Sequence, residues 1–142
     1  MTYTATLNEA RALAAIDVTR FRDAIAAARA NEDDFEVDCQ RFISSDTIDG
    51  VLQDELASDP YVLGHFRAGF IANILDIDAK AVEDIQKAGA FEALGKMLLP
   101  HIKKVARNYA IAEGYGHHFS HWDGGEKKIT LAGRMYHVFR TD

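Results

Sequence analysis

The spacing of apolar residues changes along this 142-residue chain, and the change separates segments that favour helices from segments that favour strands. Over most of the chain, apolar residues recur at intervals of about 3.6 residues, the period of an amphipathic helix. Within residues 34–43 they alternate with polar residues, which is the pattern of a half-buried strand. After residue 118, glycines separate short apolar segments. The sequence therefore predicts an α+β fold, in which a mostly helical body carries a small antiparallel sheet.

Helix start and stop signals divide the helical part into four to six predicted helices. Thr6 and Glu9 have the spacing of a capping box and begin a helical segment that extends to residue 28. Asp17 offers a second cap, so this segment is either one helix or two. The remaining predicted helices span residues 47–57, 60–75, 79–88 and 90–113. Pro100 is expected to kink or divide the last of them, because proline cannot donate the helical hydrogen bond.

The predicted strands lie in residues 34–43 and in three short C-terminal segments. The C-terminal segments span residues 119–123, 129–132 and 136–139, with turns at the glycines between them. Strand 34–43 is a candidate to join the sheet that these segments form. Its apolar face would hold Phe35, Val37 and Cys39, so Cys39 is predicted to be a small buried hydrophobe. No internal repeat or low-complexity linker is visible, and the chain is expected to fold as one domain, residues 1–142.

Composition and the start of the chain limit the class of protein. The hydrophobic content of 48% and the charged content of 27% are typical of a soluble globular protein. The first residues lack the basic segment and apolar run of a signal peptide, and no apolar segment approaches the ~18 residues that cross a bilayer. Cys39 is the single cysteine and cannot form an internal disulfide. We therefore expect a cytoplasmic protein without a membrane partner.

Residues 31–59 carry ten carboxylates and a single cation, Arg41. We call these carboxylates the acidic block: Glu32, Asp33, Asp34, Glu36, Asp38, Asp46, Asp49, Asp54, Glu55 and Asp59. Residues 1–60 hold 13 acidic and 5 basic residues, whereas residues 61–142 hold 9 and 11, so the formal charges of the two parts are −8 and +2. Such a surface repels nucleic acid and attracts the basic phosphate-binding grooves of nucleic-acid enzymes. The alternative interpretation is a solvated helix face and an acidic loop.

The acidic block supplies the predicted protein-binding residues. They are Asp33, Asp34, Glu36, Asp38, Asp46, Asp49, Asp54 and Glu55. So many carboxylates within one short segment repel one another, and a basic partner would relieve that repulsion. Arg11, Arg22 and Arg29 are candidates for bidentate pairs that hold the block in shape. Phe35 and Phe42 are candidates for apolar contacts that slow dissociation of the partner.

A helix-turn-helix pattern overlaps residues 72–85. Its small, apolar and inward positions are Ala72, Leu75, Ile77, Val82 and Ile85. The turn position usually given to glycine is Asp76, and the second helix presents both acidic and basic side chains to solvent. Carboxylates near phosphates forfeit the counterion release that drives DNA binding. A helical hairpin within the core is therefore the favoured interpretation, and a DNA-binding regulator is the alternative function.

Three histidines lie close together near the C-terminus: His117, His118 and His121. With Asp123 they provide the donor types that bind zinc or another transition metal when the side chains converge. The nearby glycines argue against a helix, and on a strand His117 and His121 would share a face while His118 would point away. Exposed turn histidines are the more frequent arrangement, so no metal or other cofactor is expected. A metal-dependent enzyme that uses these histidines is a third functional hypothesis.

Other catalytic signatures are missing from the sequence. A nucleophilic cysteine would need a histidine partner, and Cys39 is expected on an apolar strand face. The chain has no nucleophile elbow, phosphate-binding loop or dinucleotide-binding glycine motif. A small basic group comprises Lys96, Lys103, Lys104 and Arg107. This group is interpreted as a solvated face, with nucleic acid or an acidic protein surface as alternative partners.

Three short strings give the chain a resemblance to small accessory proteins of bacteriophages and prophages. They are Ser58-Asp-Pro-Tyr-Val-Leu-Gly-His-Phe, Phe91-Glu-Ala-Leu-Gly and Gly114-Tyr-Gly-His-His-Phe, and the resemblance covers about residues 35–123. Members of this group with a known role are often inhibitors of host defence, including anti-CRISPR and anti-restriction proteins, several of which are acidic. The resemblance implies a stoichiometric protein inhibitor in the cytoplasm of the host cell and implies no catalytic residues.

These observations predict a non-enzymatic protein–protein interaction module without a cofactor. Its expected partner is a basic surface of a host protein or nucleoprotein complex, and direct nucleic-acid binding is not expected. Gly64 and Gly69 permit close helix packing, either within the chain or between two copies, so a homodimer is compatible with the sequence.

Overall fold

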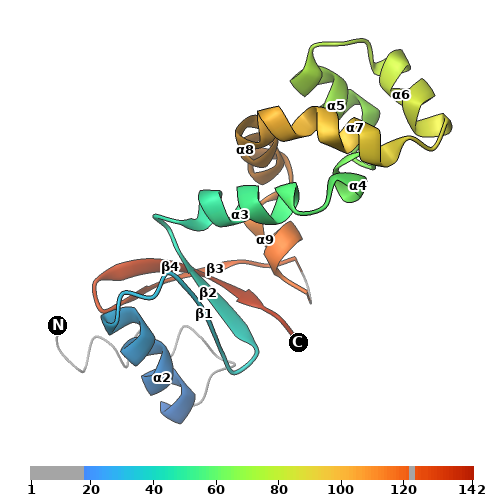
Figure 1. The fold of residues 1–142 in the computed structure, drawn as a ribbon. Coiled ribbons are helices and arrows are strands. Elements are labelled where there is room, and N and C mark those ends of the chain that lie inside the picture. Colours follow the sequence, from blue (N-terminus) through green and yellow to red (C-terminus); the bar gives the residue numbers. More distant parts are fainter. Residues whose placement is uncertain (1–17, 122–123) are drawn as a thin grey trace. The chain divides into compact units, whose positions relative to one another are not determined.

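The computed structural model describes residues 18–121 and 124–142 (Figure 1). The chain forms two compact units. The sheet unit combines the N-terminal part of the chain, through Ile48, with Glu113–Asp142. The helical unit is the continuous segment Asp49–Ala112. The predicted α+β class is confirmed, because helices form most of the described chain and accompany a four-stranded antiparallel sheet.

The four strands of the sheet are arranged in the order β1-β2-β4-β3. Their bounds are β1 Asp34–Val37, β2 Gln40–Ser44, β3 Lys127–Leu131 and β4 Arg134–Arg140. The N-terminal hairpin meets the C-terminal hairpin where β2 pairs with β4, with Phe42 opposite Val138 and Ile43 opposite His137. Residues from segment 34–43 therefore do join the C-terminal strands, as the alternation of their side chains suggested.

Segment 34–43 is a hairpin rather than the single strand that the sequence predicted. Val37 pairs with Gln40, and the two residues between them, Asp38 and Cys39, have φ angles of 52° and 59°. Positive φ at both central residues is typical of the type I′ turn, whose twist matches that of the flanking strands. The alternation did not reveal this turn because its residues are Asp-Cys instead of the usual Asn-Gly or Asp-Gly. Cys39 is consequently exposed and not buried on an apolar face.

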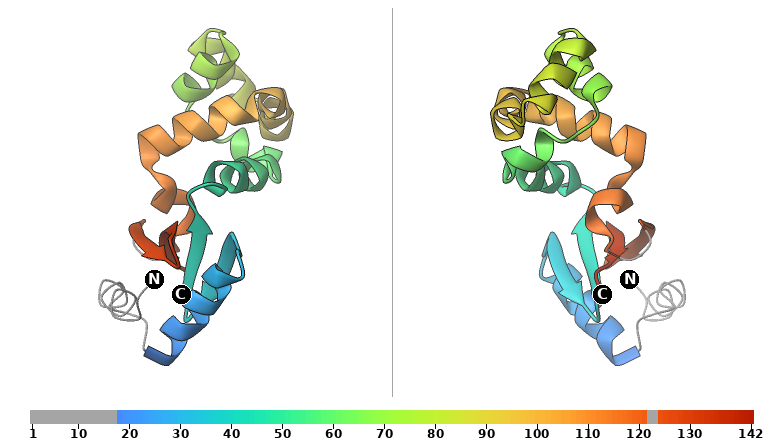
Figure 2. Two further views of the ribbon diagram at one scale, coloured as in Figure 1. Left: turned by 90° about the vertical axis from the view of Figure 1, so that its left-hand side faces the viewer. Right: turned by 90° about the vertical axis from the view of Figure 1, so that its right-hand side faces the viewer.

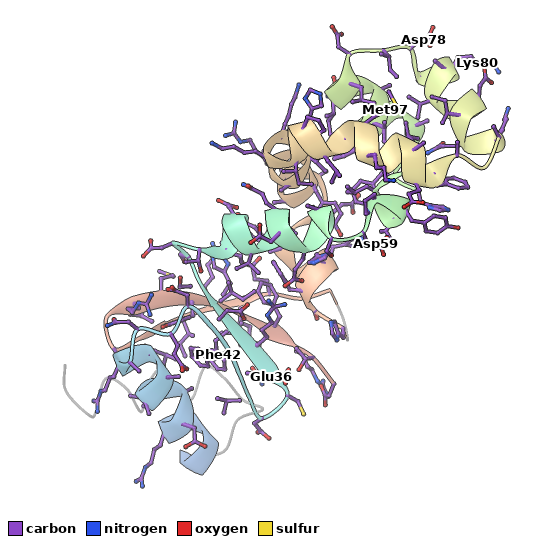
Figure 3. All side chains as sticks on the ribbon, viewed as in Figure 1. Glu36, Phe42, Asp59, Asp78, Lys80 and Met97 are labelled. Atoms are coloured by element: carbon purple, nitrogen blue, oxygen red, sulfur yellow. The ribbon has the colours of Figure 1, made fainter. Side chains whose placement is uncertain are left out.

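Helix α2 (Val18–Arg29) packs against one face of the sheet (Figure 2). Its buried residues and their strand partners form one core: Ala24, Ile25, Ala28, Phe42, Ile129, Leu131, Tyr136 and Val138. Phe42 is fully buried in this core (Figure 3), and burial of such a side chain stabilises the fold by about 1.5–3 kcal/mol. The predicted N-terminal helix is confirmed over Val18–Arg29, and residues 6–17 lie outside the described residues.

Helix α9 (Tyr115–Phe119) forms among glycines that were expected to disfavour a helix, and the predicted strand 119–123 is not found in its described residues, 119–121. The ring centroids of Phe119 and Phe139 lie 5.1 Å apart, on the sheet face opposite the core around Phe42. Gly116 is buried in this helix, and a Cβ there would lie 2.1 Å from the carbonyl oxygen of Gly124. These glycines thus allow two backbone segments to touch instead of ending a helix, which is why the prediction was wrong.

The helical unit is built from α3 to α8. Their bounds are α3 Ile48–Ala57, α4 Pro60–Leu63, α5 Ala68–Leu75, α6 Ala79–Lys87, α7 Phe91–Leu98 and α8 Ile102–Glu113, with a 3₁₀ turn at Leu99–His101. Pro100 lies in that turn and divides the predicted helix 90–113. Asp59 caps α4 and Asp78 caps α6 through their side chains. The helices are shorter and more numerous than their apolar periodicity indicated.

The predicted helix 60–75 is divided into α4 and α5, and two glycines explain where α4 lies. A Cβ on Gly64 would lie 1.9 Å from the carbonyl oxygen of Phe91, and a Cβ on Gly95 would lie 1.7 Å from that of Pro60. The backbones of α4 and α7 are therefore in direct contact, which glycine alone permits. The close approach expected at Gly64 is confirmed.

The segment after α4 is held by one glutamine from α6. Gln86 Nε2 donates hydrogen bonds to the carbonyl oxygens of Gly64 at 3.0 Å and Phe66 at 2.9 Å. In a continuous helix, backbone N–H groups would donate to these two carbonyl oxygens. Here the Gln86 side chain donates to them instead. Gly69, the other glycine predicted to allow close packing, has no atom within 4 Å of a Cβ position, so it mediates no close approach within the described chain.

Candidate interaction surfaces

The acidic block is divided between the two units of the chain. The sheet unit holds its members from Glu32 to Asp46, and the helical unit holds Asp49, Asp54, Glu55 and Asp59. Nine of the ten carboxylate residues are exposed, and Glu55 is half-buried. The block is therefore two acidic surfaces, which we call the sheet acidic surface and the helical acidic surface.

Asp34 of the sheet acidic surface forms a bidentate ion pair with Arg41 on the neighbouring strand. Arg41 Nε and Nη2 donate to the two Asp34 carboxylate oxygens at 2.8 and 2.6 Å. The guanidinium carbon of Arg41 also lies 5.1 Å from the centroid of the Phe119 ring, within range of a cation–π contact. The one cation inside the acidic block thus stabilises the β1–β2 hairpin and its contact with α9.

Asp33 joins the beginning of β1 to β4 through Arg134. Arg134 Nη2 donates to Asp33 Oδ1, and Arg134 Nη1 donates to the carbonyl oxygen of Glu32 at 3.0 Å. The hydroxyl of Ser44, which is buried, donates to the same Asp33 oxygen at 3.1 Å. The hydrogen bond to Asp33 raises the pKa of Arg134 above its ordinary value. Asp33 therefore has a structural role, because it connects residues that are 101 positions apart.

Tyr136 extends this network into the core. Its hydroxyl donates to the carbonyl oxygen of Glu32 at 2.7 Å and accepts from Arg134 Nη1 at 2.8 Å. Burial is the main cause that raises the pKa of Tyr136, and the Arg134 cation opposes it. The arginines that pair with carboxylates of the acidic block here, Arg41 and Arg134, are not among the three predicted to do so. Among the described residues, Arg22 and Arg29 are exposed on α2, and Arg11 lies outside them.

The remaining carboxylates of the block differ in their surroundings. Glu36 accepts a hydrogen bond from the Thr141 hydroxyl, and Asp59 Oδ1 accepts from the backbone N–H of Val62 at 3.3 Å. Asp46 is exposed in the loop before α3, and Asp54 is exposed on α3. Of the predicted protein-binding residues, Asp33 and Asp34 are thus committed to internal arginine pairs, whereas Asp46 and Asp54 present their charge to solvent.

The three histidines near the C-terminus do not form a metal site in the described part of the chain. His117 and His118 lie on α9, and the N–H of His121 donates to the carbonyl oxygen of Arg140 at 2.8 Å. Asp123, the predicted fourth ligand, lies outside the described residues. Within residues 18–121 and 124–142, no group of three or more histidine, cysteine or carboxylate side chains is arranged to hold a metal ion.

His137 is a buried histidine with a carboxylate partner, and it lies outside the predicted histidine cluster. It is buried at 6% exposure on β4, its Nδ1 contacts the Glu126 carboxylate, and its ring lies 5.3 Å from that of Tyr115. The alternation of β4 was the available signal, because it places His137 on the same sheet face as Phe139. A buried imidazole with a carboxylate partner is satisfied as a core residue.

Cys39 lies beside a shallow hollow at the β1–β2 turn. The hollow is lined by Asp38, Cys39, Gln40, Arg140 and Asp142, and no histidine is among them. Arg140 Nε donates to Asp142 Oδ1 at 2.7 Å. The lining of this hollow therefore offers no imidazole to activate the Cys39 thiol.

The helix-turn-helix pattern corresponds to α5, a turn and α6. Ala72 and Val82 are buried, as the pattern requires, but Ile77 is 39% exposed. Asp76 takes the left-handed conformation that this turn usually gives to glycine, with φ of 57°. Lys80 and Asp84 form an ion pair at 3.3 Å on the exposed side of α6. The local geometry is that of a helical hairpin whose exposed side carries charges of both signs.

The small basic group is spread over two helices. Lys96 pairs with Glu92 on α7 at 3.7 Å. The other members, Lys103, Lys104 and Arg107, are exposed on α8. An exposed pair at i, i+4 contributes only about 0.3–0.5 kcal/mol, so this group is consistent with a solvated face.

The exposed aromatic side chain beside the helical acidic surface is Tyr61. Tyr61 is 56% exposed, and its neighbour Val62 is 48% exposed. The Tyr61 ring lies 4.5 Å from the ring of His65 and 5.9 Å from that of Phe91. The phenylalanines proposed from sequence as apolar contacts are instead parts of the core. Phe42 is fully buried, and Phe35 stacks on it at 5.0 Å.

No helix within the described residues has the length and apolar character that a membrane crossing requires. Comparison with known proteins gave no match of this chain to a family model, to a curated protein or to a solved structure.

Proposed function

We propose that this protein is a non-enzymatic interaction module that occupies a basic surface of a nucleic-acid-processing complex. The observation that supports this proposal best is the exposure of nine of the ten carboxylate residues in the acidic block. Desolvating a carboxylate is costly, so exposed acidic residues favour a partner that supplies compensating positive charge. The resemblance to phage accessory proteins makes a host-defence complex, of the CRISPR or restriction kind, the proposed target in the host cytoplasm.

The proposed mechanism is occlusion of a groove that otherwise binds phosphates. Long-range attraction between carboxylates and a groove lined with lysine and arginine accelerates encounter, and salt weakens that attraction. Asp46 and Asp54 are the carboxylates best suited to this role, because both are exposed. Asp46 belongs to the sheet acidic surface and Asp54 to the helical acidic surface.

A pull-down from host lysate with stepwise salt elution tests this function. The test variant carries Asp46→Lys and Asp54→Lys, and the matched control carries Asp23→Lys and Glu83→Lys. Asp23 and Glu83 are exposed on α2 and α6, so both double variants change the net charge by the same amount. We expect a nucleic-acid-handling complex to be captured by the wild-type protein and the control and to be lost with the test variant.

Two results would contradict the proposal. Equal capture by the test variant would mean that the acidic block is only a solvated face. Recovery of DNA instead of a protein complex would favour the regulator that uses the α5–α6 hairpin. Thermal melting of all three proteins shows whether loss of capture reflects loss of folding.

A further inference from the structure

A buried glutamine lines the hollow at the β1–β2 turn. Gln40, the first residue of β2, is 5% exposed and is paired with Val37 on β1 and Arg140 on β4. Within residues 18–121 and 124–142, no group makes a hydrogen bond with its side-chain amide. A buried amide without a hydrogen-bond partner destabilises a fold, so its retention needs a physical reason. A ligand that enters the hollow would provide one, because it would bond to this amide.

The sheet pairing places the Gln40 side chain on the face that carries the hollow. Residues directly opposite each other in an antiparallel pair share a face, so Gln40 and Arg140 project from the same side of the sheet. The segment after β4 is held beside the turn (Figure 1), because the N–H of Thr141 donates to the Cys39 carbonyl oxygen at 2.9 Å. All the lining residues belong to the sheet unit. The hollow is therefore formed by two segments that are far apart in the chain and fixed against each other.

The hollow carries one carboxylate more than it carries cations. Its charged lining residues are Asp38, Asp142 and Arg140. Arg140 Nε donates to Asp142 Oδ1 at 2.7 Å, and this hydrogen bond lowers the pKa of Asp142 below its ordinary value. No cation of the described residues pairs with Asp38. The uncompensated charge is therefore negative, which favours a cationic occupant.

The size of the hollow and its donor groups favour a lysine side chain. The volume is about 190 Å³. Pockets for whole small-molecule ligands begin near about 300 Å³, so a single side chain is the better match. Asp38, Cys39 and Asp142 are not arranged to hold a metal ion, as for every such group in the described part of the chain. A lysine ammonium is compact and has three donors, which suits separate acceptors on two residues.

We propose that this hollow binds a lysine side chain of the protein partner, with the Asp38 carboxylate and the Gln40 amide oxygen as its acceptors. The ammonium would then compensate the charge of Asp38 and satisfy the buried amide of Gln40. This inference rests on the proposed function. It specifies which residue type of the basic surface is recognised and where on the sheet acidic surface it binds.

Nuclear magnetic resonance titration with hexa-lysine tests the site without the unidentified partner. The chain has three glutamines, Gln40, Gln53 and Gln86, and the spectrum of Gln40→Met identifies the side-chain amide signal of Gln40. We expect hexa-lysine to shift this signal until it saturates, and the Nε-acetylated peptide, which has no side-chain charge, to leave it in place. Gln53 lies on α3 next to Asp54, so its signal reports general attraction to the helical acidic surface. Hexa-arginine has the same charge and should shift the Gln40 signal less.

Asp38→Asn and its matched control, Asp23→Asn, separate the site from general attraction. Asparagine tolerates the φ of 52° at position 38, so this variant keeps the turn and removes the charge. We expect the hexa-lysine affinity, followed by the Gln40 signal, to fall by about twofold to fivefold, as for loss of one exposed ion pair. Asp23 is exposed on α2 and does not line the hollow, so Asp23→Asn removes the same charge and should change this affinity much less.

Gln40→Met tests the buried amide itself. It replaces a buried polar group without a partner by an apolar side chain of similar length, so we expect a higher melting temperature. It should also weaken hexa-lysine binding, followed by the backbone amide signal of Cys39. A lower melting temperature would mean that the amide is already satisfied in the unbound protein and would overturn the inference.

The lysine site and the proposed function can fail independently. Equal losses for Asp38→Asn and Asp23→Asn, or a larger Gln40 shift with hexa-arginine, would overturn the lysine site. Salt-dependent capture of a complex through Asp46 and Asp54 would remain in that case. Lysine binding that depends on Asp38, without such capture, would retain the site and contradict the occlusion mechanism.

Discussion

At the scale of single residues, the arginine pairs explain why the sheet unit tolerates so many carboxylates. Asp34 pairs with Arg41 and Asp33 pairs with Arg134, so two negative charges are compensated inside the unit. Both pairs are partly exposed, so each contributes little to the free energy of unfolding. Their main effect is to hold the start of β1 against β2 and β4. The carboxylates available to a partner are therefore fewer than the block contains.

Replacing Tyr136 tests the buried end of this network. Tyr136→Phe removes the hydroxyl that donates to the Glu32 carbonyl oxygen and accepts from Arg134 Nη1, and these two groups remain hydrogen-bonded to each other. Because that direct hydrogen bond remains, we expect the free energy of unfolding near neutral pH to fall by about 0.5–1.5 kcal/mol, the net value of one hydrogen bond. Urea denaturation followed by circular dichroism measures this change. An unchanged unfolding free energy would mean that the hydrogen bond adds nothing to stability.

The same residue predicts a dependence of stability on alkaline pH. Burial raises the pKa of Tyr136 above its ordinary value of 10.0, so the folded protein holds the phenol proton more tightly than the unfolded chain. This contribution is fully present below pH 10.0 and is lost as the pH rises through the raised pKa. Wild-type stability should therefore fall more steeply than that of Tyr136→Phe above this pH. Parallel curves in a urea denaturation series would contradict the assignment.

Two glycine substitutions in the helical unit distinguish the destabilising effect of a steric clash from the stabilising effect of a higher helix propensity. Gly95→Ala places a Cβ 1.7 Å from the carbonyl oxygen of Pro60, and neither backbone can yield without moving a helix. We expect a loss of about 1–3 kcal/mol, as for overpacked cores. Gly69→Ala is the matched control, because its Cβ meets no atom within 4 Å, and it should stabilise α5 by about 0.5–1 kcal/mol. Thermal and urea denaturation of the two variants should show opposite signs.

At the scale of elements, the β1–β2 hairpin is the clearest departure from the sequence prediction. An alternating pattern has the same period on one strand as on two strands joined by a two-residue turn. The pattern of segment 34–43 therefore located the sheet residues but not the reversal of the chain at Asp38 and Cys39. The positive φ of both turn residues was not encoded by a glycine or an asparagine.

Substitutions at Cys39 distinguish the observed turn from a continuous strand, because the two structures predict opposite effects on stability. Cys39→Gly supplies a residue that adopts positive φ without strain and should stabilise the protein by about 0.5–1 kcal/mol. Cys39→Val introduces a β-branched side chain at φ of 59° and should destabilise it by about 1–2 kcal/mol. If Cys39 lay on the apolar face of a strand, valine would be tolerated and glycine would leave a cavity. Melting temperatures of the two variants distinguish these outcomes.

At the scale of the whole molecule, the continuity of the helical unit is the feature that can be tested directly. Residues Asp49–Ala112 form one uninterrupted segment, whereas the sheet unit needs both ends of the chain. The buried residues of the helical unit come from every one of its longer helices and include Leu52, Leu63, Ile71, Val82, Leu94 and Val105. A segment of about 60 residues buries only about 60% of its unfolded surface, so its stability alone should be low.

We expect residues 48–113, expressed alone, to be helical and to unfold cooperatively at a lower temperature than the full chain. Circular dichroism at 222 nm, which reports helix content, follows this transition. A fragment without helical signal would show that the helical unit depends on the sheet unit. In that case the full chain should unfold as one domain. Its far-ultraviolet and near-ultraviolet circular dichroism signals should then change in a single coincident transition.

The sequence by itself determined the features that depend on neighbouring residues. The division at Pro100 and the α+β class follow from propensities and periods that act over a few positions. The excess of carboxylates between residues 31 and 59 was equally visible in the sequence.

Tertiary structure decided the features that depend on distant segments. The pairing of Asp33 with Arg134, the helix at Tyr115–Phe119 and the exposure of Tyr61 each require backbone contacts between residues far apart in the chain. The same holds for the division of the acidic block between two units. A residue's sequence neighbours set which local conformations are favourable, but the space and partners around its side chain come from the rest of the fold.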